Sequence, residues 1–167
     1  IQALYLPGGY PELHTQALSE NRSMLANIKL LADSDMPIWA ECGGFMYLMK
    51  EIIDQLGEPW PMVGVFDAAC KMTGQIAHLG YRTATLQLPC PLGMKGMKIR
   101  GHEFHYSTLV KEPENSQVYE LTDRNDANPR PEGYLYKNTL GSYAHLHLGS
   151  NPKAAAAFVG SALKFGV

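Results

Sequence analysis

The chain has 167 residues, of which 46% are hydrophobic, enough for one well-packed domain and too few for two of ordinary size. Its formal net charge of -2 and the lack of a dense Lys/Arg run argue against nucleic acid or a membrane surface as the main partner. Three cysteines without paired spacing, no bilayer-spanning apolar run and no signal-peptide pattern predict a disulfide-free, cytoplasmic protein.

The first half of the chain alternates between strand-like and helix-like segments. Residues 3–6 form an apolar run typical of a buried strand, and the loop after it contains Gly8 and Gly9, which allow close backbone approach. The segment that follows carries apolar residues at helical spacing, and residues 37–40 form a second apolar run. This order is typical of a parallel sheet, which would place Gly8, Gly9 and Cys42 at one carboxyl edge, where such sheets hold their sites.

Cys42 lies at the predicted turn from the second strand into a helix. Apolar residues after it fall at helical spacing as far as Leu56, and Gly43 and Gly44 let the backbone turn sharply. The arrangement parallels the nucleophile elbow of serine hydrolases, with sulfur in place of oxygen. Because a helix N-terminus favours thiolate over thiol, we predict that Cys42 is a nucleophile of lowered pKa. A buried structural cysteine is the alternative.

The second half of the chain is predicted to be strand-rich and largely antiparallel. Short strand patterns cover residues 62–66, 78–86 and 97–107, with turn residues between them. The polar stretch 112–132 is expected to include a mobile surface loop, and no chemistry is assigned to it. Near the end, Asn151 and the proline after it predict the start of a last helix.

A cysteine nucleophile needs a base, and histidine is the side chain suited to that role near neutral pH. The chain has six histidines. Residues 140–148 alternate like a strand, so His145 and His147 are expected on one face, within reach of the edge that holds Cys42. We predict that His145 is the base, whereas a structural or surface role is the alternative for any single histidine.

Five motifs, taken together and in order, carry a family resemblance. They are PGGYPE (7–12), AECGGFMYL (40–48), LGYR (79–82), GHEFHYS (101–107) and SYAHLHL (142–148). In this order they resemble the glutamine amidotransferase domain of cobyrinic acid a,c-diamide synthases. The resemblance covers nearly the whole chain, and the five ordered motifs are far more specific than any one of them.

The resemblance implies an α/β fold of the class I glutamine amidotransferase type. Such a fold has three layers, with a central mostly parallel sheet and an antiparallel, strand-rich second half. Residues 1–167 would form one glutamine amidotransferase domain that is incomplete at its N-terminus and lacks the first strand and helix of the family fold.

The resemblance also implies the chemistry of the site. Cys42 would attack the side-chain amide of glutamine, with His145 as base and then as acid, and backbone N–H groups near Gly9 and of Gly43 would stabilise the oxyanion. Other residues expected to bind glutamine or support this site are Gly8, Tyr81, Arg82, His102, Glu103 and His105. His147 stands where many class I enzymes have a glutamate, which leaves the third member of the site open and makes His147 an auxiliary candidate.

Glu103 is a candidate to orient a site histidine, and an ordinary paired carboxylate is the equal alternative. The resemblance implies no metal and no cofactor in this domain. ATP and Mg²⁺ would serve a synthetase domain N-terminal to it in the same polypeptide, and these residues contain no phosphate-loop motif. A homodimer is left open.

Three other functions stay open at this point. The glutaminase half alone does not separate a cobyrinic acid enzyme from a nickel-sirohydrochlorin a,c-diamide synthase. A metal-dependent hydrolase could use Cys42 with the histidines at 102, 105, 145 and 147, although no His-Glu-x-x-His helix supports it. A domain that keeps the fold and serves only for interaction is the third alternative.

Overall fold

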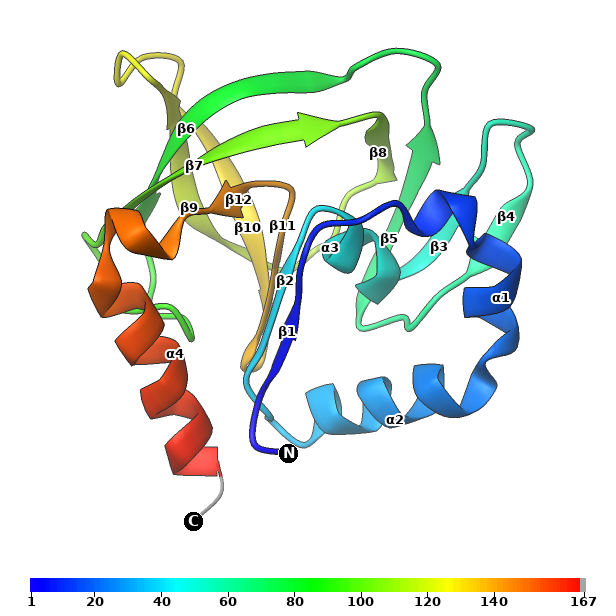
Figure 1. Ribbon diagram of the computed structural model, residues 1–167, viewed down its shortest axis with the longest axis horizontal. Coiled ribbons are helices and arrows are strands. Elements are labelled where there is room, and N and C mark those ends of the chain that lie inside the picture. Colours follow the sequence, from blue (N-terminus) through cyan, green and yellow to red (C-terminus); the bar gives the residue numbers. More distant parts are fainter. Residues whose placement is uncertain (166–167) are drawn as a thin grey trace.

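The structure, a computed structural model, describes residues 1–165, which form two β-sheets and four α-helices (Figure 1). The strands are β1 (Leu4–Leu6), β2 (Ile38–Glu41), β3 (Met49–Ile53), β4 (Pro59–Pro61), β5 (Phe66–Met72), β6 (His78–Leu86), β7 (Lys98–His105), β8 (Ser107–Lys111), β9 (Ser116–Asp123), β10 (Arg130–Tyr136), β11 (Thr139–Ser142) and β12 (His145–Leu146). The helices are α1 (Thr15–Glu20), α2 (Arg22–Asp33), α3 (Gly43–Leu48) and α4 (Pro152–Phe165), with short 3-10 helices η1 (Pro11–Leu13) and η2 (Leu148–Ser150).

The larger sheet has the strand order β1-β2-β11-β10-β9-β6-β7-β12, and the smaller one the order β4-β3-β5-β8. β1 runs parallel to β2, and α1 and α2 make the crossover between them, as the opening pattern of the sequence predicted. β2 is also parallel to β11, whereas the remaining described pairs of this sheet are antiparallel. The sheet is therefore mixed, with a smaller parallel part than the alternation at the start predicted.

Alternation along β2 divides the hydrophobic core between the two faces of the larger sheet. Ile38 and Ala40 are fully buried in one cluster with α2 and α3. Trp39 points the other way and packs against Phe158 of α4, with ring centroids 5.9 Å apart. The helices α2 and α3 thus cover one face and α4 the other, which gives three layers.

The helix after Cys42 is much shorter than its apolar spacing predicted. α3 ends at Leu48, Met49 has extended backbone angles, and the chain continues as β3 between β4 and β5. The prediction of a helix as far as Leu56 is therefore wrong. Met49 and Ile52 are both fully buried, but they are buried by neighbouring strands, which suits the β-branched pair Ile52 and Ile53.

One prediction for the second half is also wrong. Residues 62–65 connect β4 to β5 and form no strand. The polar stretch 112–132 includes an exposed loop, at residues 124–129, and much of the rest forms β9 and the start of β10 in the larger sheet. Both faces of β9 are partly covered, because Val118 and Leu121 are both buried although residues three apart on a strand point to opposite faces. Pairing of β9 with both β6 and β10 decides the structure of these residues, not the mean polarity of the stretch.

Other predictions for the second half are confirmed. β6 and β7 form the expected antiparallel hairpin, which arches over the carboxyl ends of β1 and β2 in Figure 1. α4 begins at Pro152, and the Asn151 side chain accepts a hydrogen bond from the backbone N–H of Lys153 at 3.2 Å.

All three cysteines are free. No helix within residues 1–165 is both long enough and apolar enough to cross a bilayer.

Candidate active site

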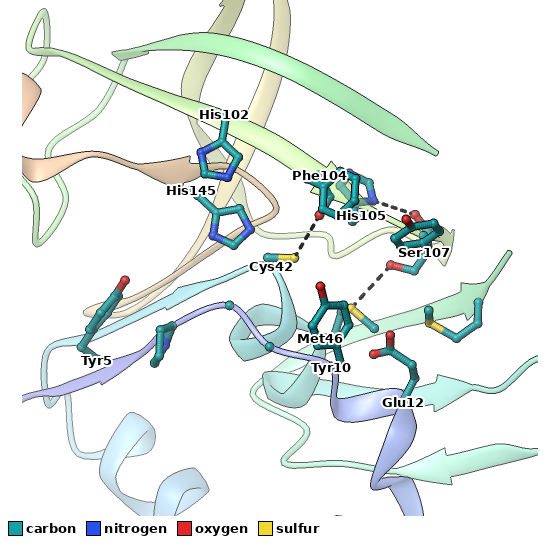
Figure 2. Close-up of a pocket in the computed structure, with 15 residues that line it drawn as sticks. Tyr5, Tyr10, Glu12, Cys42, Met46, His102, Phe104, His105, Ser107 and His145 are labelled. Carbon is teal, nitrogen blue, oxygen red and sulfur yellow. Dashed lines mark hydrogen bonds between the residues drawn. The ribbon is translucent and has the colours of Figure 1, made fainter. Parts of the chain in front are cut away.

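A pocket of about 370 Å³ opens at the carboxyl ends of the parallel strands β1 and β2 (Figure 2). This volume lies within the range of roughly 300 to 1,000 Å³ that is common for small-molecule sites. The pocket brings together residues from five segments of the chain. Its lining is Tyr5, Pro7, Gly8, Gly9, Tyr10, Glu12, Cys42, Met46, Met72, His102, Phe104, His105, Tyr106, Ser107 and His145.

Cys42 occupies a strained backbone position between β2 and α3. Its φ is 48° and its ψ is -108°, a combination that non-glycine residues rarely adopt. The glycines after it are required, because a Cβ on Gly43 would stand 2.4 Å from the Gly9 carbonyl oxygen and one on Gly44 would stand 2.3 Å from that of Leu6. The loop after β1 thus lies directly against the start of α3.

The Cys42 thiol does not have the lowered pKa that the sequence predicted. Burial raises its pKa to about 11, the carboxylates of Glu12, Glu41 and Glu103 add to the increase, and the nearby N–H of Gly43 only partly opposes them. Cys42 is 7% exposed, and its thiol donates a long hydrogen bond of 3.8 Å to the Phe104 carbonyl oxygen. The resting group is therefore a thiol. Its proton is shared with the Phe104 carbonyl oxygen and must turn toward a base before it can be transferred.

His145 faces the same pocket from β12, and Figure 2 shows its imidazole beside the Cys42 side chain. Its ring stacks on His102 of β7, with centroids 4.8 Å apart and planes at 8°. Gly8 lies against the Cε1 edge of the ring, since a Cβ there would be 2.2 Å from His145 Cε1. Burial, with a contribution from His102, lowers the His145 pKa, so the imidazole is neutral and can accept a proton at neutral pH.

Two buried carboxylates that sequence reasoning missed hold the segment that carries His145. Glu41 accepts hydrogen bonds from the Leu146 backbone N–H at 2.6 Å and from the Tyr5 hydroxyl at 2.8 Å. Glu132 accepts from the Ser142 hydroxyl at 2.5 Å and from the Tyr143 N–H at 2.8 Å. Glu41 could have been noticed, because a carboxylate inside an apolar strand needs a partner. Glu132 carries no such signal, because it lies in a stretch whose polarity predicts a loop.

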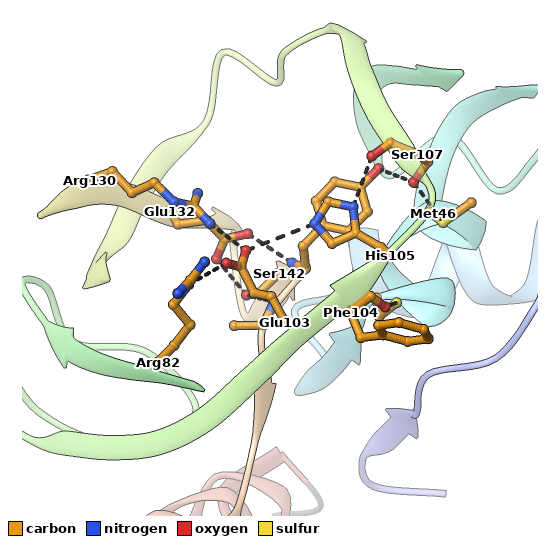
Figure 3. A network of polar contacts seen from close by, with 12 residues as sticks. Met46, Arg82, Glu103, Phe104, His105, Ser107, Arg130, Glu132 and Ser142 are labelled. Carbon is orange, nitrogen blue, oxygen red and sulfur yellow. Dashed lines mark hydrogen bonds and ion pairs between the residues drawn. The ribbon is translucent and has the colours of Figure 1, made fainter. Parts of the chain in front are cut away.

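Glu103 and Arg82, both predicted site residues, meet in an ion-pair cluster outside the Cys42 pocket (Figure 3). Arg82 donates to Glu103 at 2.6 Å, and Arg130 makes a second close ion pair with the same carboxylate. Burial alone would raise the pKa of Glu103, but the bonds and charges of Arg130 and Arg82 hold it below its usual value. This environment matches the paired-carboxylate alternative.

His105 forms part of the wall between the Cys42 pocket and the Glu103 cluster. Its Nδ1–H donates to the Ser107 carbonyl oxygen at 2.8 Å, and its ring stacks on Tyr143 with centroids 4.0 Å apart. Burial lowers the His105 pKa to about 4, so the ring is neutral. Nε2 is 4.0 Å from a Glu103 oxygen and has no hydrogen-bond partner within residues 1–165.

Tyr81 and His147 lie outside the pocket, whereas the predicted site residues Gly8, Gly9, His102, His105 and His145 line it. Tyr81 is 74% exposed on β6. His147 is exposed just before η2, because the chain bends after β11 and β12 is only two residues long. The prediction that His145 and His147 share one strand face is thus wrong. Across the described residues no three His, Cys, Asp or Glu side chains gather as a metal site would require.

Comparison with known proteins gives matches over most of the chain. Residues 1–153 match the CobB/CobQ-like glutamine amidotransferase domain. A cobyrinate a,c-diamide synthase of Leptospira interrogans is 40% identical over 166 residues, which cover 98% of this chain and 37% of the relative. A synthase of the same name from Caldanaerobacter subterraneus is 38% identical over 99% of this chain and 36% of its own length. The chain thus spans little more than a third of these relatives.

Solved structures give the same fold. A crystal structure of a glutamine amidotransferase matches with a TM-score of 0.66 and 20% identity, over 100% of this chain and 80% of that one. A glutamine amidotransferase of Thermotoga maritima matches with a TM-score of 0.52 and 13% identity, over 99% of this chain and 66% of its own. The predicted amidotransferase-like α/β fold is confirmed.

Proposed function

The chain belongs to the CobB/CobQ-like glutamine amidotransferase domain family, and from this premise we propose that it is the glutaminase part of a cobyrinate a,c-diamide synthase. One observation carries the proposal: a thiol on a strained strand-to-helix turn and a neutral imidazole line the same small pocket. A nucleophile beside a base is the arrangement that splits amide hydrolysis into two easier steps.

In the first step the Cys42 sulfur bonds to the amide carbon of glutamine while its proton passes to His145. The amide oxygen becomes an oxyanion beside the backbones of Gly9 and Gly43, which are in close contact. Backbone N–H donors at such a position typically contribute about 3 kcal/mol each to the transition state. The positive φ of Cys42 supports this geometry, because it turns the sulfur and the following N–H toward one space.

In the second step the carbon–nitrogen bond breaks and the imidazolium of His145 gives its proton to the leaving nitrogen, which departs as ammonia. A glutamyl thioester remains on Cys42. Water then attacks this thioester with His145 as base, and glutamate leaves as the thiol is restored. The whole sequence needs no cofactor in this domain.

The ammonia would serve a synthetase domain of the same polypeptide, consistent with relatives that are almost three times as long as this chain. There ATP and Mg²⁺ would activate the a and c acetate carboxylates of cobyrinic acid. A nickel-sirohydrochlorin a,c-diamide synthase would use the same glutaminase chemistry. The names of the relatives favour the cobyrinate reaction.

Substitution of Cys42 by alanine in the full-length synthetase tests this proposal. We expect glutamine-dependent amidation to disappear while ammonium salts still support amidation, because only the source of ammonia is lost. His145→Ala should do nearly the same, and His147→Ala should change the glutamine-dependent rate appreciably less. Glutamine-dependent amidation by the Cys42→Ala enzyme would refute the assignment.

A further inference from the structure

We propose that Glu12 selects free glutamine by binding the α-ammonium group of the substrate. Glu12 is the only side-chain carboxylate among the described residues that line the pocket with Cys42. Glutamine carries one positive charge, on its α-nitrogen, and a carboxylate is the protein group that binds such a cation most strongly. The inference rests on the proposed glutaminase function.

The Glu12 carboxylate is free to take a ligand. Glu41, Glu103 and Glu132 each accept hydrogen bonds from other residues, and Glu103 has two arginine partners. Within residues 1–165 Glu12 has no ion pair, and the one hydrogen bond that lowers the pKa of its carboxyl comes from its own backbone N–H. Partial burial raises its pKa, as expected for a charge that lacks a partner, and an ammonium group would supply one.

The position of Glu12 suits the far end of the substrate. η1 follows directly after the loop that holds Gly8 and Gly9, so the fold places Glu12 in the same pocket as the two catalytic side chains. Figure 2 shows Glu12 and His145 on opposite sides of Cys42 in this view. When the side-chain amide of glutamine lies at Cys42, the α-carbon is three bonds from the amide carbon. Glu12 borders the part of the pocket on the side of Cys42 away from His145, where this α-carbon would lie.

Binding there would also prepare the nucleophile. Among the carboxylates, Glu12 contributes most to the raised pKa of Cys42, ahead of Glu41 and Glu103. An ammonium group paired with Glu12 cancels this repulsion and makes the thiol easier to deprotonate. Cys42 is therefore a protected thiol in the empty pocket and becomes more reactive once an unblocked amino acid is bound.

The test compares glutamine with N-acetylglutamine, which keeps the side-chain amide but lacks the ammonium group. We expect the full-length wild-type enzyme to prefer glutamine strongly. In Glu12→Gln the KM for glutamine should rise about 10- to 100-fold, while kcat/KM for N-acetylglutamine should stay the same or rise several-fold, because the charge that opposes ionisation of Cys42 is gone, so that the preference largely disappears. Glu12→Asp, which keeps the charge, should recover part of it. Glu114→Gln, at an exposed carboxylate, is the matched control.

A second measurement separates recognition from general damage. Without glutamine, the Cys42 of Glu12→Gln should react several-fold faster with iodoacetamide than that of wild type, because a repulsive charge is gone. A wild-type KM and an intact preference for unblocked glutamine in Glu12→Gln would overturn the inference. If instead the wild-type enzyme amidates with ammonium salts but never hydrolyses glutamine, the proposed function itself fails.

Discussion

Cys42 and His145 are both kept neutral by the burial that shields their pocket from water. The pKa of the thiol rises to about 11 and that of the imidazole falls, so neither group is charged at neutral pH. Proton transfer is then coupled to attack on a bound carbonyl instead of preceding it. Such a pair resists stray electrophiles, which react with thiolates.

The position of the His145 ring depends on the absence of a side chain at Gly8. In Gly8→Ala the new Cβ would stand 2.2 Å from His145 Cε1, so the imidazole must leave the position that it has beside Cys42. We expect kcat for glutamine hydrolysis to fall at least about 100-fold, the size of effect that misplacement of a reacting group by about 1 Å can have.

Gly74→Ala is the control for this prediction, because a Cβ at Gly74 has no neighbour within 4 Å and should leave kcat unchanged. Ammonium-supported amidation should be normal in both variants. Wild-type glutaminase activity in Gly8→Ala would show that the ring is not held where the structure places it.

The sequence identifies the residues of this site more reliably than it predicts their protonation states. A glycine-lined turn and the chemical need for a base point to Cys42 and His145, and both line one pocket. The predicted direction of the Cys42 pKa shift is wrong. It depends on burial and on Glu12 and Glu103, which only the folded chain brings near the thiol.

At the scale of elements, the bend between β11 and β12 decides which histidine enters the pocket. β11 pairs with β2, whereas β12 pairs with β7 on the far edge of the larger sheet. The Glu41 and Glu132 carboxylates bind backbone N–H groups on either side of this bend. They fix β12 in place, so that His145 faces Cys42 while His147 faces solvent.

Glu41 should therefore act on catalysis through the position of His145. In Glu41→Ala the Leu146 N–H and the Tyr5 hydroxyl lose their acceptor, and β12 loosens. We expect kcat for glutamine hydrolysis to fall about 10- to 100-fold with a smaller change in KM. Glu41→Gln keeps one acceptor for the Leu146 N–H and should restore most of the rate. A normal kcat in Glu41→Ala would contradict this role.

Elements are predictable where local pattern and tertiary pairing agree. The crossover from β1 to β2, the β6–β7 hairpin and α4 all follow from short-range patterns and are present. The helix predicted beyond Leu48 is wrong, and polarity does not reveal β9 within the stretch 112–132. In both segments burial between two neighbouring strands decides the structure, because β3 lies between β4 and β5 and β9 lies between β10 and β6.

At the scale of the whole molecule, the ordered motifs predicted the fold family but not the arrangement of its strands. The larger sheet joins β1 at one edge to β12 at the other, so its two ends come from opposite ends of the chain. The active site draws on both ends, because Gly8 and His145 are in contact. The active site therefore forms only when the entire larger sheet is folded.

Glu132 should make the stability of this fold depend on pH. Burial raises its pKa to about 7, against opposing hydrogen bonds from Ser142 and Tyr143. A carboxyl with a raised pKa in the folded state stabilises most below its unfolded pKa, and this contribution is lost as pH rises to about 7. Relative to wild type, Glu132→Gln should therefore gain stability between about pH 4.5 and pH 7, by up to roughly 3 kcal/mol.

Urea unfolding of both proteins at about pH 5 and about pH 8 measures this difference. Glu114→Gln, at an exposed position, should show the same difference from wild type at both pH values. A Glu132→Gln difference that does not change with pH would mean that Glu132 is ionised in the fold throughout.

The central claim, that Cys42 is the nucleophile and His145 its base, is tested most directly by labelling with the glutamine analogue diazo-oxo-norleucine and locating the adduct by mass spectrometry. We predict one adduct, on Cys42, formed much more slowly in His145→Ala and at a nearly normal rate in His147→Ala. Labelling of Cys70 or Cys90 in place of Cys42, or equal rates in His145→Ala and wild type, would contradict the account.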